Sequence, residues 1–414
     1  MFFLIRAALI AVLLALPLMG CVDDSTGGSG SDNSDADGFD FTVMFANYAD
    51  NIILPNYEAV ARLAIDIESE TGPISTYCQS IGTANESAAV NAAKNAWDGL
   101  MLAIQETELH ILGPAASNNN ALSNRLNSSA IGSISLCGVD QSVVQSAQDP
   151  GFDIDSKTVT QRGIGALEYL LFNSDLAQNC PSQIVETADW DSRPAAQRQL
   201  LRCEYAIVVA SDIASTAADL RDAWSSDAGD YRSTFINPAN TGDSLEELSD
   251  ALFYLDLDVA DRKLAIPTGV NDACAALSCP QSVESPYSQY SLDNIRANLQ
   301  SFGTLMTGGS GLGFDDLIDD AGVPELNQRF ADNTAAAIAF IDTASESLFE
   351  QASAIDSSAA ETDCNNAYAN PDVIGRFSAC NLLGVIKLIN DDLKIGFVAA
   401  IEVDLPDRAQ SDND

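Results

Sequence analysis

Residues 162–172 read RGIGALEYLLF, and this stretch sets the fold class of the chain. Most of it is an apolar run of helix-forming residues, interrupted by a single glutamate, Glu168. Gly163 and Gly165 precede the glutamate by about one turn, so a helix here has a gap at backbone level beside a carboxylate. Close approach of a neighbouring helix would explain the gap. A binding site for a ligand, a hydrated cation or a partner side chain would explain it equally.

Much of the remaining chain repeats the helical pattern. Apolar residues recur at spacings of three to five positions, whereas strand-like alternation is scarce. Ser244-x-x-Glu247 has the form of a capping box and predicts the start of a further helix. The other segments predicted to be helical are 42–68, 86–112, 194–224, 291–307, 324–355 and 381–402.

These segments predict an all-α fold of two helical-bundle domains. A polar, turn-rich region at 225–242 separates them, which gives an N-terminal domain over 39–230 and a C-terminal domain over 231–405. The octamers GALEYLLF (165–172) and DALFYLDL (250–257) share a pattern. That similarity suggests an origin of the two domains by duplication.

The charge of the chain is strongly acidic. Its 414 residues include 60 acidic and 19 basic side chains, for a formal net charge of −41. Such a surface repels phosphate backbones, so nucleic acid is excluded as a partner. We expect most of this charge on solvated faces and in an acidic tail at 406–414. A diffuse field that attracts cations is the functional alternative.

The N-terminus carries an export signal. Residues 1–20 combine a basic start, an apolar stretch of signal-peptide length and the sequence Leu18-Met19-Gly20, followed by Cys21. This ending resembles the lipobox of bacterial lipoproteins, in which the cysteine is acylated before cleavage. We therefore expect a mature chain that begins at acylated Cys21 and continues as a flexible acidic tether over 21–38. Val22 favours the outer membrane, facing the periplasm or the cell surface. An ordinary signal peptide with a chance cysteine is the alternative.

Eight of the nine cysteines remain after Cys21 is set aside. An even number in an exported chain predicts up to four disulfides. Eight cysteines allow 105 pairings, so the sequence does not fix the connectivity. Cys274–Cys279 and Cys364–Cys380 are the favoured pairs, because they would close short loops. A structural zinc site is the alternative, which the lack of C-x-x-C pairs and the single histidine disfavour.

Several segments, in this order, resemble the imelysin family of exported helical proteins, also classed as M75 peptidases. The resemblance runs from about Asn47 to Glu402. Its segments are Pro55-Asn56-Tyr57, Ala96-Trp97, Leu112-Gly113-Pro114, RGIGALEYLLF, LSDALFYLDLDVADRKLAIPTG (248–269) and ESPYSQYSLDNIRANLQ (284–300).

The resemblance implies two helical domains of four-helix-bundle type, related by duplication, and a hallmark motif, G-x-H-x-x-E. Gly163 and Glu168 match the ends of that motif, whereas Gly165 stands in the place of the histidine. A His–Glu metal pair is therefore not expected here. Glu168 is left as the one candidate metal ligand. Iron or calcium would suit it, although nothing in the sequence requires a metal.

Further pocket candidates come from the segments that resemble the family in the second half of the chain. Arg296 and Asn298 point to different sides of a helix, so at most one should line a pocket together with Ser288. Structural hydrogen bonds that hold loops to the bundles are the alternative role for such residues. The full candidate set is Arg162, Gly163, Gly165, Glu168, Asp261, Lys263, Ser288, Arg296 and Asn298.

These features favour a non-enzymatic binding or accessory lipoprotein that serves iron or other metal acquisition, as the resemblance implies for some family members. An M75-type metallopeptidase is the second hypothesis, and a structural lipoprotein without a small ligand is the third. The single histidine, His110, cannot supply the two imidazoles of an H-E-x-x-H zinc site, whereas a catalytic metal held by carboxylates alone is the alternative. The enzyme question therefore stays open and leans towards no activity. Expected partners are the membrane leaflet, through the lipid anchor, and a metal-uptake receptor or another envelope protein.

Overall fold

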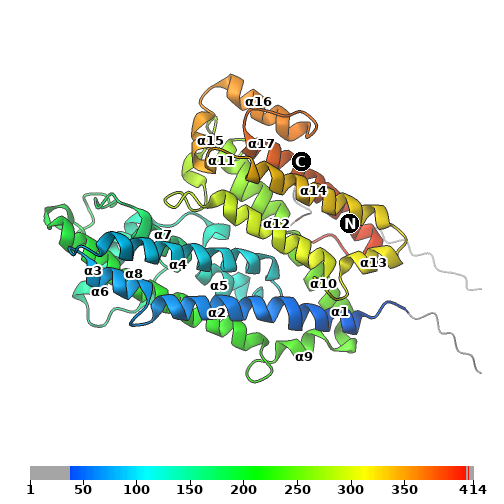
Figure 1. The fold of residues 1–414 in the computed structure, drawn as a ribbon, viewed down its shortest axis with the longest axis horizontal. Coiled ribbons are helices and arrows are strands. Elements are labelled where there is room, and N and C mark those ends of the chain that lie inside the picture. The colour runs from blue at the N-terminus through cyan, green and yellow to red at the C-terminus, as the bar shows by residue number, and fades with distance from the viewer. Residues whose placement is uncertain (1–37, 407–408, 410–414) are drawn as a thin grey trace, which may run out of the picture. The chain divides into compact units, whose positions relative to one another are not determined.

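The computed structural model describes residues 38–406 and residue 409. The predicted signal peptide, the acylation site at Cys21 and nearly all of the tether lie outside the described residues, as does most of the tail at 406–414. Every regular element within the described range is a helix, which confirms the all-α prediction (Figure 1). None of these helices combines the length and apolar content that a bilayer crossing needs.

Within the part of the chain that the structure describes, the α-helices vary widely in length, and three π-helical segments and seven short 3₁₀ turns lie among them. The α-helices are α1 Phe41–Tyr48, α2 Leu54–Glu68, α3 Pro73–Ser80, α4 Glu86–Thr107, α5 Ser117–Leu126, α6 Leu136–Gln148, α7 Gly163–Phe172, α8 Ala195–Trp224, α9 Tyr231–Phe235, α10 Thr241–Leu252, α11 Ile266–Thr268, α12 Ser291–Thr307, α13 Phe314–Asp320, α14 Pro324–Asp342, α15 Leu348–Ala354, α16 Ser358–Ala369, α17 Ser378–Asp392 and α18 Val398–Ile401. The π-helices are Ala49–Ile53, Leu255–Ala265 and Leu393–Phe397, and the 3₁₀ turns are Glu108–His110, Ser129–Ile131, Ile154–Ser156, Val159–Gln161, Trp190–Ser192, Pro238–Asn240 and Pro280–Ser282.

The first group of helices is built around α8. This helix follows Pro194, and its apolar stripe packs along α2 on one side and α7 on another. Tyr205, Val209 and Ile213 of that stripe are all fully buried, as the periodicity predicts. Helix α4 packs on α2 and α7 and completes the group (Figure 1).

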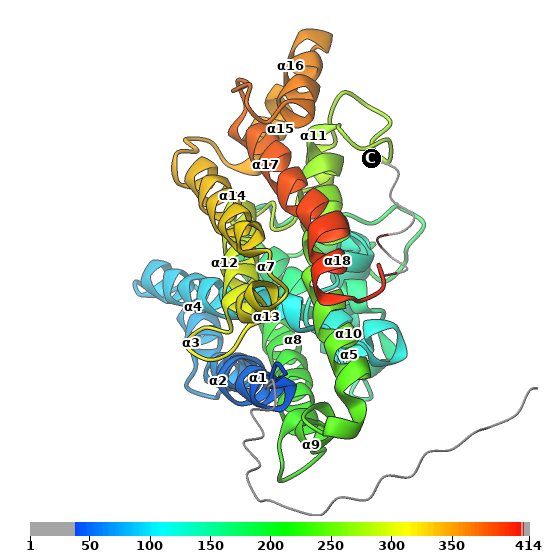
Figure 2. The same ribbon diagram turned by 90° about the vertical axis from the view of Figure 1, so that its right-hand side faces the viewer.

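The second group is built around α14 and α17, which pack along one another. The π-helix Leu255–Ala265 lies against α17, and α12 packs on α14. Helix α12 also contacts α4, so the hydrophobic core is continuous between the two groups (Figure 2). The described residues from Phe39 onward form one compact unit. The division into domains at residue 230 stays a prediction.

Several predicted helix boundaries need correction. The helix expected over 324–355 breaks at 343–347, because Ser347 and Glu350 form a capping box that starts α15 anew. The capping-box prediction at Ser244 is wrong. Helix α10 already begins at Thr241, which places Ser244 inside it, where its side chain is buried.

Four disulfides link the eight cysteines that lie between residues 38 and 406. The predicted pairs Cys274–Cys279 and Cys364–Cys380 are confirmed. The other two join residues farther apart in sequence: Cys78–Cys203 ties α3 to α8, and Cys137–Cys180 ties α6 to the loop after α7.

Candidate functional site

Helix α7 places Glu168 at the centre of the site. It begins at Gly163, whose φ of +77° suits glycine. A Cβ there would lie 2.7 Å from the Arg125 carbonyl oxygen, so only glycine fits this start. The Trp97 indole of α4 donates a hydrogen bond of 3.0 Å to the Ile164 carbonyl and fixes the first turn. The direction of the Glu168 side chain is therefore set by a rigid helix.

The carboxylate of Glu168 is buried, with 1 % of the residue exposed, and one of its oxygens sits in a cradle of donors. Oε1 accepts hydrogen bonds from the Tyr287 backbone N–H at 2.9 Å, the Ser288 N–H at 2.7 Å and the Ser288 hydroxyl at 2.9 Å. Within the part of the chain that the structure describes, no donor contacts Oε2. Burial outweighs these hydrogen bonds and raises the pKa of Glu168 from 4.5 to about 7.

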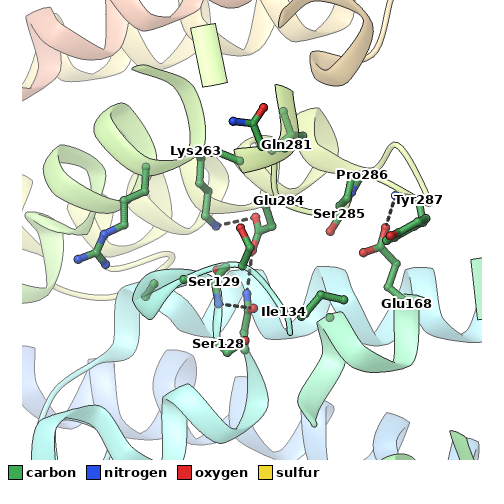
Figure 3. A pocket seen from close by; sticks show the side chains of 18 of the residues that line it. Ser128, Ser129, Ile134, Glu168, Lys263, Gln281, Glu284, Ser285, Pro286 and Tyr287 are labelled. Atoms are coloured by element: carbon green, nitrogen blue, oxygen red, sulfur yellow. Dashed lines mark hydrogen bonds and ion pairs between the residues drawn. The ribbon is translucent and has the colours of Figure 1, made fainter. Parts of the chain in front are cut away.

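Glu168 borders a cavity of about 490 Å³ (Figure 3). The segment 127–136 between α5 and α6 forms one side, and the segment 281–287 before α12 forms another. Met101, Tyr254 and Phe349 close other parts of the wall. The cavity therefore combines segments that are distant in the sequence.

A buried ionic cluster forms the wall beside Lys263. The Lys263 ammonium donates to Glu108 at 2.6 Å and forms an ion pair with Glu284 at 3.2 Å. It also donates to the amide oxygens of Gln105 and Asn298 at 2.5 and 2.9 Å. Although desolvation opposes it, the charge of the two glutamates raises the pKa of Lys263. The π-helix Leu255–Ala265 positions this lysine.

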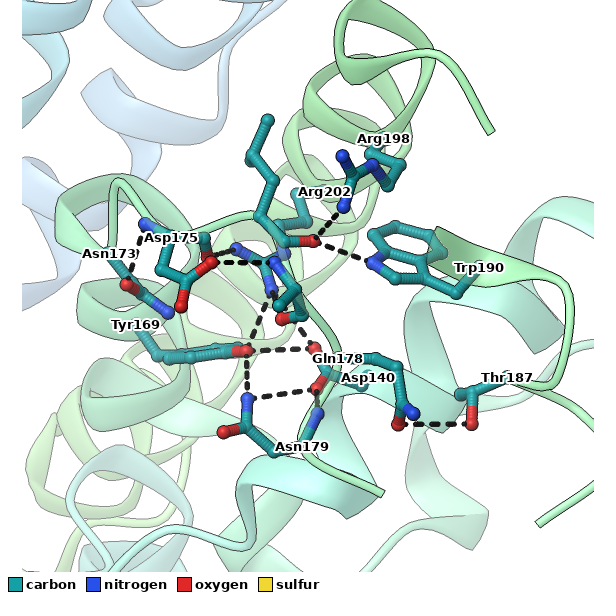
Figure 4. A network of polar contacts seen from close by, with 12 residues as sticks. Asp140, Tyr169, Asn173, Asp175, Gln178, Asn179, Thr187, Trp190, Arg198 and Arg202 are labelled. Carbon is teal, nitrogen blue, oxygen red and sulfur yellow. Dashed lines mark hydrogen bonds and ion pairs between the residues drawn. The ribbon is translucent and has the colours of Figure 1, made fainter. Parts of the chain in front are cut away.

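A second polar cluster, around Arg202 of α8, holds the loop that follows α7 (Figure 4). Arg202 donates to the backbone oxygens of Asp175 and Ala177 at 2.7 and 3.0 Å and to the Tyr169 hydroxyl at 2.8 Å. Tyr169 in turn donates to Asp140 at 2.9 Å. The ring of Tyr169 meets the ring of Tyr287 edge-on at 5.3 Å. This cluster thus supports the backbone donors of the Glu168 cradle.

A sequence profile described as imelysin matches residues 53–370, which is most of the chain. The chain belongs to the imelysin family. Two solved structures share the imelysin fold with it. An imelysin-like protein from Psychrobacter arcticum 273-4 aligns with a TM-score of 0.58 and 15% identity, covering 88% of this chain and 96% of that one. A "putative iron-regulated protein A precursor" from Parabacteroides distasonis ATCC 8503 aligns with a TM-score of 0.53 and 15% identity, covering 87% and 97%. No curated protein matches the chain.

The geometry shows what replaces the histidine of the imelysin motif. Gly165 and Glu168 lie three positions apart on α7, so both face the cavity. A Cβ on Gly165 would come within 2.9 Å of the Ile134 Cγ2 atom. The Ile134 methyl group thus fills the space where a side chain at position 165 would begin.

The candidates from the sequence fall into three sets. Gly165, Glu168 and Lys263 line the cavity. Gly163, Ser288 and Asn298 lie behind the wall: Gly163 starts α7, while Ser288 and Asn298 hold the charged side chains in place. Arg162, Asp261 and Arg296 do not line the cavity.

The three outlying candidates have other surroundings. Arg162 forms an ion pair with Asp155 at 2.8 Å and does not fold back to Glu168. Arg296 is part of the surface and contacts Asp342. Asp261 borders a separate, very small pocket.

The main residue that sequence reasoning missed is Glu108, which accepts hydrogen bonds from Tyr254, Asn127 and Lys263. The sequence feature that could have identified Glu108 is the position of a charged residue on the apolar face of a helical segment, between Ile104 and Ile111.

The residues at Glu168 do not fit a metal ion held by the protein alone. Zinc takes about four protein ligands, and calcium takes about six to eight oxygens. Among the described residues no group of three or more His, Cys, Asp or Glu side chains is arranged to hold an ion. A metal at this cavity would have to bring most of its ligands with it.

Proposed function

We propose that this imelysin-family chain is a non-enzymatic binding protein of the bacterial envelope that serves the acquisition of iron or another metal. It would be anchored through acylated Cys21 and would work beside a metal-uptake receptor or another envelope protein. The observation that carries the proposal is the cavity with Glu168, because a pocket of this size that combines apolar walls with converging polar groups is typical of a small-ligand site. The name of the iron-regulated structural neighbour supports the metal link.

The surroundings of His110 favour binding over peptidase chemistry. This histidine is fully buried, and its Nε2 atom lies 2.9 Å from the Asn56 amide nitrogen. Burial lowers its pKa to about 4, so it stays neutral near pH 7. It does not line the cavity. The family motif G-x-H-x-x-E would place an imidazole at the position that Gly165 occupies.

Deletion of the gene in the source organism tests this proposal. We expect slower growth under iron limitation and reduced uptake of radiolabelled iron. A plasmid copy should restore both, whereas copies with Cys21→Ala or with the cavity filled by Ile134→Phe should not. Uptake that is unchanged in the deletion strain for every metal tested would refute the proposed role. Chelator-sensitive peptide hydrolysis by the purified chain would favour the peptidase instead.

A further inference from the structure

We propose that the cavity beside Glu168 binds a small organic molecule with an apolar body and one ammonium group, and that the ammonium contacts Glu168 Oε2. The inference rests on the proposed binding function and names the chemical class of its ligand.

The size and walls of the cavity indicate an organic occupant. Its volume of about 490 Å³ lies within the range of about 300 to 1,000 Å³ found for small-molecule sites. Met101, Ile134, Leu136, Val283 and Phe349 supply apolar side chains to its wall. These surfaces gain free energy when an apolar body displaces water from them.

The two oxygens of Glu168 locate the polar end of the ligand. Oε1 already receives three hydrogen bonds, which nearly saturate it. Oε2 receives none from the described chain, but it is not sealed off, because it faces the cavity that Glu168 borders. A bound ammonium group in the cavity could therefore reach Oε2 and form a charge-assisted hydrogen bond with it.

The charges around the cavity favour a cation over an anion. Both basic side chains of the lining are paired: Lys263 with Glu108 and Glu284, and Arg262 with Asp258 at 2.6 Å. The lining itself carries three carboxylates, those of Glu168, Asp258 and Glu284, against these two cations. An anionic ligand would therefore meet a net negative wall in a chain of net charge −41.

The test uses three probes that share one apolar body: naphthylmethylamine, naphthylmethanol and naphthoate. Isothermal titration calorimetry of the purified chain at about pH 8 keeps Glu168 ionised. We expect the amine to bind at least about tenfold more tightly than the alcohol, as one charge-assisted hydrogen bond implies. Naphthoate should bind more weakly than either. Glu168→Gln should reduce the affinity for the amine to that for the alcohol.

Matched variants keep the test sharp. Glu204→Gln changes an exposed glutamate on α8 and should leave binding of the amine unchanged. Ile134→Phe fills the cavity and should abolish binding of both the amine and the alcohol. Thermal unfolding of each variant shows whether it is folded. If Glu168→Gln does not fold, the proposal is still tested by the ranking of the three probe affinities on the unaltered chain and by the loss of binding in Ile134→Phe.

Four outcomes would overturn the proposal. They are naphthoate binding as tightly as the amine, no measurable binding of any probe, amine affinity that survives Glu168→Gln, and tight binding of bare calcium or ferrous ion that Glu168→Gln removes. If the probes fail while the deletion strain still loses iron uptake, only the ligand class is wrong. If the amine binds while uptake is unchanged, the role in metal acquisition is wrong.

Discussion

Replacing Glu168 with glutamine should stabilise the chain above neutral pH. The pKa of Glu168 is raised from 4.5 to about 7, so the folded state resists ionisation of this group. In the unaltered chain, the contribution of protonated Glu168 to the unfolding free energy is therefore fully present below about pH 4.5. This contribution is lost as the pH rises through about 7. At about 1.4 kcal/mol per pH unit this interval corresponds to about 3 kcal/mol. About 2.5 kcal/mol of it falls between about pH 5 and about pH 8.

Glutamine suits this test because its amide oxygen can still accept the three hydrogen bonds that Oε1 receives. Urea unfolding of both chains, followed by circular dichroism at about pH 5 and about pH 8, gives the two differences in unfolding free energy. Comparison with Glu204→Gln, in an exposed position on α8, removes the effect of a lost surface charge. A difference between Glu168→Gln and the unaltered chain that is equal at both pH values would refute the reasoning.

Two further predictions concern stability alone. Lys263→Met leaves two buried carboxylates without their cation and should reduce the unfolding free energy by about 3 to 5 kcal/mol. Urea unfolding at neutral pH measures this loss, and a loss below about 1 kcal/mol would contradict the described ion pairs. Removing Cys78–Cys203, which closes a loop over 125 residues, should cost about 5 kcal/mol, against about 2 kcal/mol for Cys274–Cys279 with a separation of 5. Thermal unfolding of the two double Cys→Ser variants would show which disulfide contributes more to stability. Equal losses of stability in the two variants would contradict the prediction.

The helices were predictable where local signals set both of their ends. The segment 291–307 coincides with α12, because Gly308, with φ +61°, ends that helix in the left-handed conformation. The π-helix Leu255–Ala265 was not predictable, because tertiary packing and not local periodicity decides such a segment.

The site was predictable only in part, for a related reason. The segments with local motifs gave Glu168, Ser288 and Lys263. The partner of Lys263 at Glu108 lies 155 residues away along the chain, and no local pattern connects the two. The same holds for Cys78–Cys203, whereas the two short-loop disulfides could be inferred from their spacing.

The distribution of the disulfides bears on the order in which the molecule folds. Two of them close before residue 230 and two close after residue 270. The earlier pair can therefore form before the later part of the chain has folded. Glu168 must wait longer, because its hydrogen-bond donors are at Tyr287 and Ser288. The cavity also needs Phe349 in its wall, so it can form only after these distant segments have come together, and a ligand held there would mark a chain in which they have done so.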